Sequence, residues 1–254
     1  MPEFAPQILR FDSLPSTNLE AAKRAVQGAP EGLCIVASEQ TAGRGRLQRH
    51  WISPKNAGLY FSIILRPELD QRIWPLVTLM ASIAVHDTLL DAYAVETDIK
   101  WPNDILVNES KLCGILAETV DTPLGRAIVV GIGINLTSKS FPPELEGIAA
   151  SLEAAANQAV DPEVVLKALV NALGSYYQKL QQPAGTHEIL RTWCAFSSYA
   201  QGKRIRVTDS NESFIGITRG LECDGALRVE TDRAEIKIVR AGDVTNVRPW
   251  ERRA

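Results

Sequence analysis

The sequence predicts an α+β fold with a mixed, mostly antiparallel sheet, followed by a small C-terminal β-barrel. Up to about residue 195, strand patterns and long helical patterns are mixed without the regular strand–helix–strand alternation of a parallel sheet. After Ser197 only short strand patterns and turns occur. We therefore predict a main domain over residues 1–196 and a small domain over residues 197–254.

The first part of the main domain is predicted to hold a helix and two strands. Thr17 and Glu20 have the spacing of a capping box, and an alanine-rich helix that ends at Gly28 follows them. The two apolar runs that predict strands are 33–38 and 58–65. The intervening segment, 39–57, is then a long loop, and loops of that length in compact domains usually have a function.

The remaining elements follow from apolar spacing and from caps. A core-facing helix is predicted over 74–93, because its apolar residues recur at helical spacing. A later helix is predicted to begin with Asp161 as its cap and Pro162 at its first position. The predicted strands are 105–107, 112–119 and 127–135 in the main domain and 203–208, 213–219, 226–231 and 235–239 in the small one. Asp224 and Gly225 predict a hairpin turn between two of the last four.

Composition excludes several classes of protein. With 45% apolar and 22% charged residues the chain has the composition of a globular protein, and its net charge of −3 argues against a surface that embraces nucleic acid. The four cysteines and three histidines are scattered, so no zinc site is expected. No run approaches the roughly 20 apolar residues of a membrane helix, and the N-terminus lacks the regions of a signal peptide. A cytoplasmic location without membrane contact is expected.

Positive charge concentrates in the long loop, in QTAGRGR at 40–46, with Trp51 just beyond. Gly43 and Gly45 allow close backbone approach, while Arg44 and Arg46 could donate charge-assisted hydrogen bonds to phosphate oxygens. This pattern fits a loop that folds over an anionic ligand. A solvated basic turn explains it equally well, because short Gly/Arg motifs are not specific.

Two further segments carry polar residues at the ends of predicted strands. In KWPND at 100–104, Asn103 and Asp104 favour a turn, but they could also present an amide and a carboxylate to a substrate. In KLCGILA at 111–117, Lys111 could place an ammonium at the mouth of the sheet, and Gly114 could let a ligand approach the backbone. A solvated lysine is the plainer interpretation. The segment VGIGINL at 130–136 fails the dinucleotide-binding pattern, since no helix opens after it.

Taken in order, five motifs resemble the biotin protein ligase family: STN at 16–18, EQTAGRGR at 39–46, KWPND at 100–104, KLCGIL at 111–116 and GIGIN at 131–135. The tail, from GKRIRV to GALRVE, resembles the SH3-like C-terminal barrel of that family. The resemblance implies a catalytic domain with the fold of class II aminoacyl-tRNA synthetases.

The resemblance also implies an ATP-dependent ligase. Biotin and MgATP would form biotinyl-5′-AMP and pyrophosphate, and biotin would then pass to a lysine of a biotin carboxyl carrier protein of an acyl-CoA carboxylase. Arg46 and Lys111 would stabilise charge at the α-phosphate, and Asp104 would orient or deprotonate the incoming lysine. Mg²⁺ would be bound together with ATP rather than by the protein alone.

The binding residues that the resemblance implies form two overlapping sets. Those expected to bind biotin are Ser16, Thr17, Asn18, Gln40, Gly43, Arg44, Gly45, Arg46, Lys111 and Gly114. Those expected to bind ATP or the adenylate are Arg44, Arg46, Trp51, Lys100, Asn103, Lys111 and Asn135. Polar groups at a helix end suit the uncharged urea of biotin.

The sequence departs from the family in two places. The family loop usually has a third glycine shortly after the second arginine, but Leu47 and Gln48 follow here. If that position needs a positive φ, Gln48 is strained there. Regulatory members also carry an N-terminal DNA-binding domain, but only 15 residues precede Ser16, so no DNA partner is expected.

Two alternative functions stay open. One is a lipoate or octanoate ligase or transferase, which would need a long apolar tunnel in place of the polar set at residues 16–18 and 40. The other is a biotin-binding protein without catalysis, against which the presence of Arg46 and Lys111 argues. Whether the chain is a monomer or a homodimer is also open.

Overall fold

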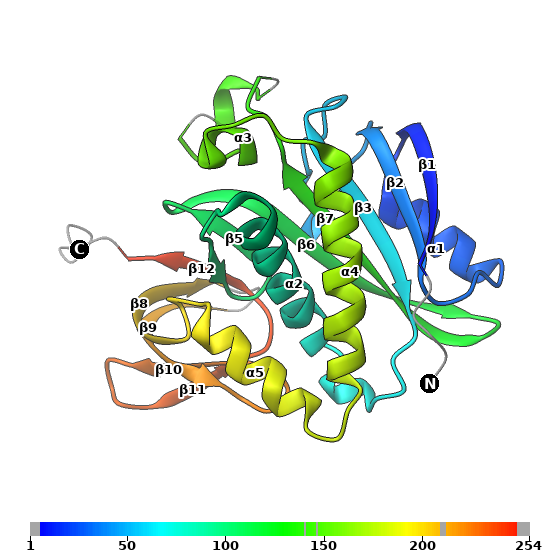
Figure 1. The fold of residues 1–254 in the computed structure, drawn as a ribbon. Helices are drawn as coiled ribbons and strands as arrows, with labels where there is room; N and C mark the ends of the chain where they lie inside the picture. The colour runs from blue at the N-terminus through cyan, green and yellow to red at the C-terminus, as the bar shows by residue number, and fades with distance from the viewer. Residues whose placement is uncertain (1–5, 140, 146, 209–211, 248–254) are drawn as a thin grey trace.

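The computed structural model describes residues 6–139, 141–145, 147–208 and 212–247, and it contains two β-sheets (Figure 1). The larger sheet has the strand order β1-β2-β3-β7-β6-β5-β4. β1 and β2 are parallel, and the other neighbouring strands are antiparallel. The strands are β1 (Gln7–Leu14), β2 (Leu33–Gln40), β3 (Gly58–Leu65), β4 (Asp98–Lys100), β5 (Asp104–Val107), β6 (Ser110–Thr122) and β7 (Gly125–Asn135). The predicted mixed, mostly antiparallel sheet is confirmed.

Helices cover both faces of this sheet (Figure 1). α1 (Thr17–Val26) packs on one face, against β2, β3, β6 and β7. α2 (Leu76–Tyr93) and α4 (Pro162–Leu180) pack together on the other face, and α5 (Gly185–Ala195) packs against both of them. A short helix, α3 (Leu152–Ala156), precedes α4, and Asp161 caps α4 as predicted, accepting a hydrogen bond from Glu163 N at 2.8 Å.

The helix α2 corrects the expectation about membrane segments. Its 18 residues have a mean hydropathy of 1.2, so by length and composition it could cross a membrane. However, 67% of the helix is buried inside the fold. It packs between the sheet, α4 and α5, which is why apolar residues occur on all of its sides.

The alternation of side chains along β7 explains where an opening can form on the sheet. Ile128, Val130 and Ile132 point into the core under α2 and α4. Ala127 and Val129 point to the opposite face, where α1 covers them. The next residues on that face are glycines, at 131 and 133: Gly131 lies beside Asn18 in the first turn of α1, and Gly133 lies beside Trp51. A small gap over the sheet therefore follows from the period-two pattern.

The predicted capping box is not formed. The N-cap is Ser16, with an extended φ of −160°, and Thr17 is the first helical residue. The Thr17 hydroxyl donates to the Gln40 side chain, and Glu20 pairs with Arg24 at 2.6 Å instead of reaching back to the cap. The tertiary contact with Gln40 thus replaces the local cap. The elements β1, β4, α3 and α5, and a last strand of the second sheet, were not predicted either.

The smaller sheet is antiparallel and has the order β11-β10-β9-β8-β12. Its strands are β8 (Gln201–Thr208), β9 (Ser213–Leu221), β10 (Leu227–Thr231), β11 (Ile236–Val239) and β12 (Asp243–Asn246). The turn at Asp224 and Gly225 is present, with a φ of +83° at Gly225. Closure into a barrel and the domain limits 1–196 and 197–254 stay predictions, and residues 1 and 254 lie outside the described residues.

Direct contacts hold the smaller sheet against the larger one. The Trp101 indole N–H donates to the backbone carbonyl of Gly225 at 3.0 Å. The Ser197 hydroxyl donates to the carbonyl of Ile99 at 2.5 Å, and the hydroxyl of Ser198 donates to Asp98 at 2.6 Å. The KWPND segment therefore lies where the two sheets meet.

Candidate active site

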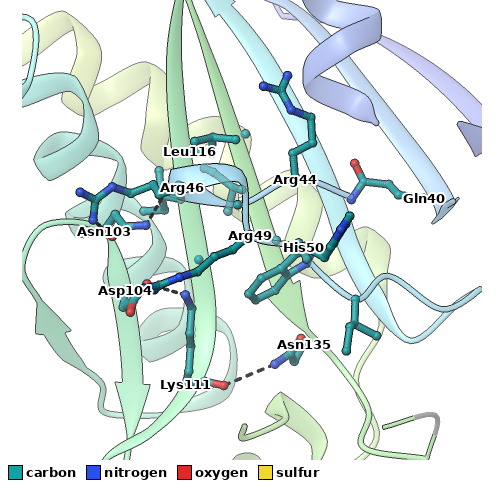
Figure 2. A pocket seen from close by; sticks show the side chains of 18 of the residues that line it. Gln40, Arg44, Arg46, Arg49, His50, Asn103, Asp104, Lys111, Leu116 and Asn135 are labelled. Atoms are coloured by element: carbon teal, nitrogen blue, oxygen red, sulfur yellow. Dashed lines mark hydrogen bonds and ion pairs between the residues drawn. The ribbon is translucent and has the colours of Figure 1, made fainter. Parts of the chain in front are cut away.

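A cavity of about 260 Å³ opens over the glycine positions of β7 (Figure 2). Its walls come from the start of α1, the loop after β2, the starts of β5 and β6, the start of β12, and the residues Leu145, Ile148 and Ala149. The predicted site residues that line it are Ser16, Thr17, Asn18, Gln40, Arg44, Gly45, Arg46, Trp51, Asn103, Asp104, Lys111, Gly114 and Asn135. Gly43 and Lys100 are not among the residues that line it.

Gln40 is fixed by hydrogen bonds on both sides of its amide. Its side-chain oxygen accepts from the Thr17 backbone N–H at 2.8 Å and from the Thr17 hydroxyl at 3.1 Å. Its amide nitrogen donates to the Ser53 hydroxyl at 2.9 Å. A small neutral ligand entering here would meet a preformed set of hydroxyl and amide groups.

Asn18 is oriented by residues that the sequence did not reveal. Its amide nitrogen donates to Glu118 at 2.9 Å and to the Leu116 carbonyl at 3.2 Å, and its oxygen lies 2.7 Å from the Ser62 hydroxyl. Glu118 also accepts from Arg44 at 2.8 Å. The available signals were weak: a serine inside the apolar run GLYFSIIL, and a glutamate two residues after Leu116 on the same strand face.

Two glycines of the GIGIN motif, Gly131 and Gly133, form the floor. A Cβ at Gly131 would lie 2.0 Å from the Asn18 side-chain oxygen, and one at Gly133 would lie 2.5 Å from the Trp51 indole nitrogen. Their spacing of two residues, which puts both on one strand face, was the signal that could have identified them. Glycine is needed here so that side chains can rest on the backbone.

The indole of Trp51 lies within the cavity. It contacts the backbone of Gly133 and approaches Gly114, and the Lys111 ammonium lies 5.4 Å from its ring centre. Ligand pockets are typically about 300–1,000 Å³, so this cavity of about 260 Å³, with the indole among its lining groups, is slightly smaller than that range. The Trp51 N–H is buried and has no hydrogen-bond partner among the described residues.

A cluster of charges forms the wall across from Gln40 (Figure 2). The Lys111 ammonium lies 2.6 Å from one oxygen of Asp104, and the Lys100 ammonium lies 3.7 Å from the other. Lys100 and Asp104 are register partners of β4 and β5, while Lys111 is the second residue of β6. These three neighbouring strands thus bring two cations to one carboxylate.

Arg46 lies at the junction of the two sheets. It donates to the Asn103 side-chain oxygen at 3.1 Å and to the Gly242 carbonyl at 3.1 Å. Burial lowers the pKa of Arg46, and the nearby carboxylates of Asp243 and Asp104 act in the opposite direction. Asn103 is itself oriented by donating to the Ile115 carbonyl at 2.8 Å, so the KWPND segment fixes the position of this arginine.

The turn after Arg46 has positive φ angles, as expected for a position where the family usually has a glycine. Leu47 has a φ of 53° and Gln48 a φ of 61°, so both lie in the left-handed region. For residues other than glycine this conformation costs roughly 1–2 kcal/mol each. The expected strain at Gln48 is present, and Leu47 adds to it.

Asn135 ends β7 at the far side of the cavity. Its amide nitrogen donates to the carbonyls of Lys111 at 3.3 Å and of Ala150 at 3.1 Å. The same Lys111 backbone pairs with the segment that follows η3 (Pro143–Leu145), donating to the Ile148 carbonyl at 2.9 Å. Asn135 therefore joins the mouth of the sheet to a segment that forms one wall of the cavity.

The arrangement matches known protein families. The family model described as "Biotin/lipoate A/B protein ligase family" matches residues 9–135, and the model "Biotin protein ligase C terminal domain" matches residues 201–245. The chain is 37% identical to the bifunctional ligase/repressor BirA of Bacillus subtilis, over 92% of this chain and 72% of that protein. The chain belongs to the biotin/lipoate A/B protein ligase family.

Further similarities lie within the biotin branch of this family. The chain is 33% identical to the biotin–[acetyl-CoA-carboxylase] ligase of Mycobacterium tuberculosis, over 92% of this chain and 86% of that one. Among solved structures, the biotin protein ligase from Aquifex aeolicus in complex with biotin and ATP superposes with a TM-score of 0.83 at 25% identity, covering 95% of this chain and 99% of that one. The biotin ligase fold, including the C-terminal antiparallel sheet, is thus confirmed.

Proposed function

We propose that the chain is a biotin protein ligase that forms biotinyl-5′-AMP and pyrophosphate from biotin and MgATP. In the second step it would transfer biotin to a lysine of a biotin carboxyl carrier protein of an acyl-CoA carboxylase. The observation that carries the proposal is a single cavity that joins a neutral hydrogen-bonding set around Gln40 to the cations Arg46 and Lys111. The names of the relatives in Mycobacterium tuberculosis and Paracoccus denitrificans support the acceptor class.

The neutral end suits the urea ring of biotin. A urea needs donors for its oxygen and acceptors for its two N–H groups, and Ser16, Thr17 and Asn18 supply hydroxyl and amide groups of both kinds. The three residues are buried at the start of α1, so their hydrogen bonds to a ligand would compete little with water. This set favours biotin over lipoate, which would need a long apolar tunnel.

The charged end suits the α-phosphate. The carboxylate of biotin attacks this phosphate, and the acceptor lysine later attacks the resulting mixed anhydride, so negative charge develops there in both steps. Fixed cations in a site that excludes water stabilise such charge most effectively. Arg46 and Lys111 would do so directly, and Lys100 would add positive potential from behind Asp104.

Asp104 would receive the proton of the incoming lysine. An ammonium is not nucleophilic until it loses a proton, and this carboxylate already lies beside two ammonium groups. In the competing role Asp104 acts only as the partner that positions Lys111. Mg²⁺ would enter as part of MgATP.

The remaining proposals concern partners and location. We propose a cytoplasmic enzyme without a DNA or membrane partner, and the choice between monomer and homodimer stays open. Measuring the mass of the native protein with and without ligands would decide between these two states.

The proposed function is tested by measuring pyrophosphate release from purified protein with MgATP and either biotin or lipoate, followed by mass spectrometry of an added carrier domain. Biotin-dependent release with addition of one biotinyl group is the expected result. Dependence on lipoate would instead assign the chain to the lipoate branch. Absence of pyrophosphate release with both compounds would contradict the proposed catalytic activity.

Replacing Gly131 by alanine is expected to weaken biotin binding about tenfold, the effect of losing a hydrogen bond worth roughly 1–1.5 kcal/mol. The new methyl group would lie 2.0 Å from the Asn18 oxygen and would displace that side chain. Isothermal titration with biotin alone measures the effect. In an Asn18→Ala background the same substitution should add little, because the clashing atoms are gone. Equal affinities of wild type and Gly131→Ala would refute this role of the glycine.

A further inference from the structure

One carboxylate of the smaller sheet contacts both arginines that flank the left-handed turn of the ligand loop. Arg49 donates to one oxygen of Asp243, and Arg46 lies 3.9 Å from the other. Arg46 also donates to the carbonyl of Gly242, the residue before Asp243. These contacts join residues almost 200 positions apart in the chain.

The turn between these arginines has little else to hold it. Leu47 and Gln48 both adopt the left-handed conformation that residues with a side chain avoid. The Leu47 side chain is 66% exposed, so packing contributes little. Inside the turn, backbone hydrogen bonds join Gly45 N to Arg49 O at 2.7 Å and Arg49 N to Arg46 O at 3.1 Å. Contacts from outside the loop are therefore needed to favour this conformation over alternatives, and Asn103 supplies one of them to Arg46 but none to Arg49.

Asp243 is placed to provide that contact. It begins β12, where it is the register partner of Thr208 on β8, so its backbone belongs to a hydrogen-bonded sheet. Its side chain is only 26% exposed and lines the cavity. An ion pair of this kind is less screened than one on the open surface.

We propose that Asp243 is a positioning residue that holds the ligand loop closed over the cavity. By joining Arg49 to Arg46, it compensates for the absence of glycine in the turn, and together with Asn103 it places Arg46 for its action on the adenylate. This last part rests on the proposed function. The small C-terminal sheet would thus determine how long the reactive intermediate stays enclosed.

The loop contact is tested on the ligand-free protein by limited trypsin digestion, because the loop contains Arg44, Arg46 and Arg49. Asp243→Asn is expected to raise the rate of cleavage after these arginines at least fivefold at low salt, with little change elsewhere. Asp232→Asn is the matched control, since it removes an exposed carboxylate of the same sheet that pairs with Arg204. It should be cleaved like the wild type.

Mass spectrometry of the fragments separates a local effect from a general one. Equal cleavage of wild type and Asp243→Asn within the loop would overturn the proposal, and so would faster cleavage over the whole chain, which indicates global destabilisation. High salt should raise loop cleavage of the wild type towards that of the variant. This result does not depend on whether the protein is a ligase.

The functional part is tested by the half-life of the bound adenylate after dilution. Asp243→Asn should shorten it at least fivefold, while Asp232→Asn should leave it unchanged. Adding Gln48→Gly to Asp243→Asn should recover part of the lost retention, because glycine adopts a positive φ readily. An unchanged half-life in Asp243→Asn would overturn the positioning role, whereas a wild type that forms no adenylate would instead contradict the proposed function.

Discussion

Replacing Lys111 by alanine is expected to lower the rate of adenylate formation about 100- to 1,000-fold, the usual effect of removing one group that stabilises developing charge. Its ammonium lies in the cavity wall, 2.6 Å from Asp104 and 5.4 Å from the ring centre of Trp51. Biotin affinity should fall much less, because the groups proposed to bind the urea lie at the start of α1, away from Lys111 on β6. Single-turnover measurement of pyrophosphate release gives the rate, and titration gives the affinity.

The control for this prediction is Lys55→Ala. Lys55 is an exposed lysine of the loop between β2 and β3, and it pairs with Asp12 rather than with any group of the cavity. Its removal should change neither quantity. A wild-type single-turnover rate for Lys111→Ala would show that the assignment of this lysine is wrong.

Replacing Arg46 by glycine is expected to turn the enzyme into a source of free biotinyl-5′-AMP, with a dissociation rate raised at least about 100-fold, equivalent to roughly 2.7 kcal/mol. The substitution removes the cation proposed to act at the phosphate, and it also removes the bonds to Asn103 and Gly242 that join the loop to both sheets. Adenylate formation should continue at a reduced rate, since Lys111 remains.

Two measurements test this expectation. The first is the half-life of the enzyme–adenylate complex in a filter-binding assay. The second is biotin transfer to an unrelated lysine-rich protein added to the reaction. Arg233→Gly, at an exposed turn of the smaller sheet, is the matched control and should transfer nothing to that protein. If Arg46→Gly retained its adenylate as the wild type does, Arg46 would have no part in enclosing the intermediate.

Local sequence patterns predicted some elements of this fold and missed others. The strands with continuous apolar runs, β3 and β7, and the helices α2 and α4 were all predicted, because buried elements leave a clear hydrophobic period. The strands β1, β4 and β12 were missed, since they are short or half exposed and take their strand conformation from a neighbour. The capping box failed for a related reason, since Thr17 gains a better partner in Gln40.

The sequence by itself determined the α+β class, the family and most residues of the cavity wall, because the chemistry of this site sits in short contiguous motifs. Only the tertiary structure decided that Glu118 and Ser62 orient Asn18, and that Asp243 holds two arginines of the ligand loop. Such pairs join residues from 44 to 194 positions apart. Along the chain each partner resembles an ordinary strand serine or a solvated carboxylate, and it acquires its role only when folding brings a second polar group within hydrogen-bonding distance.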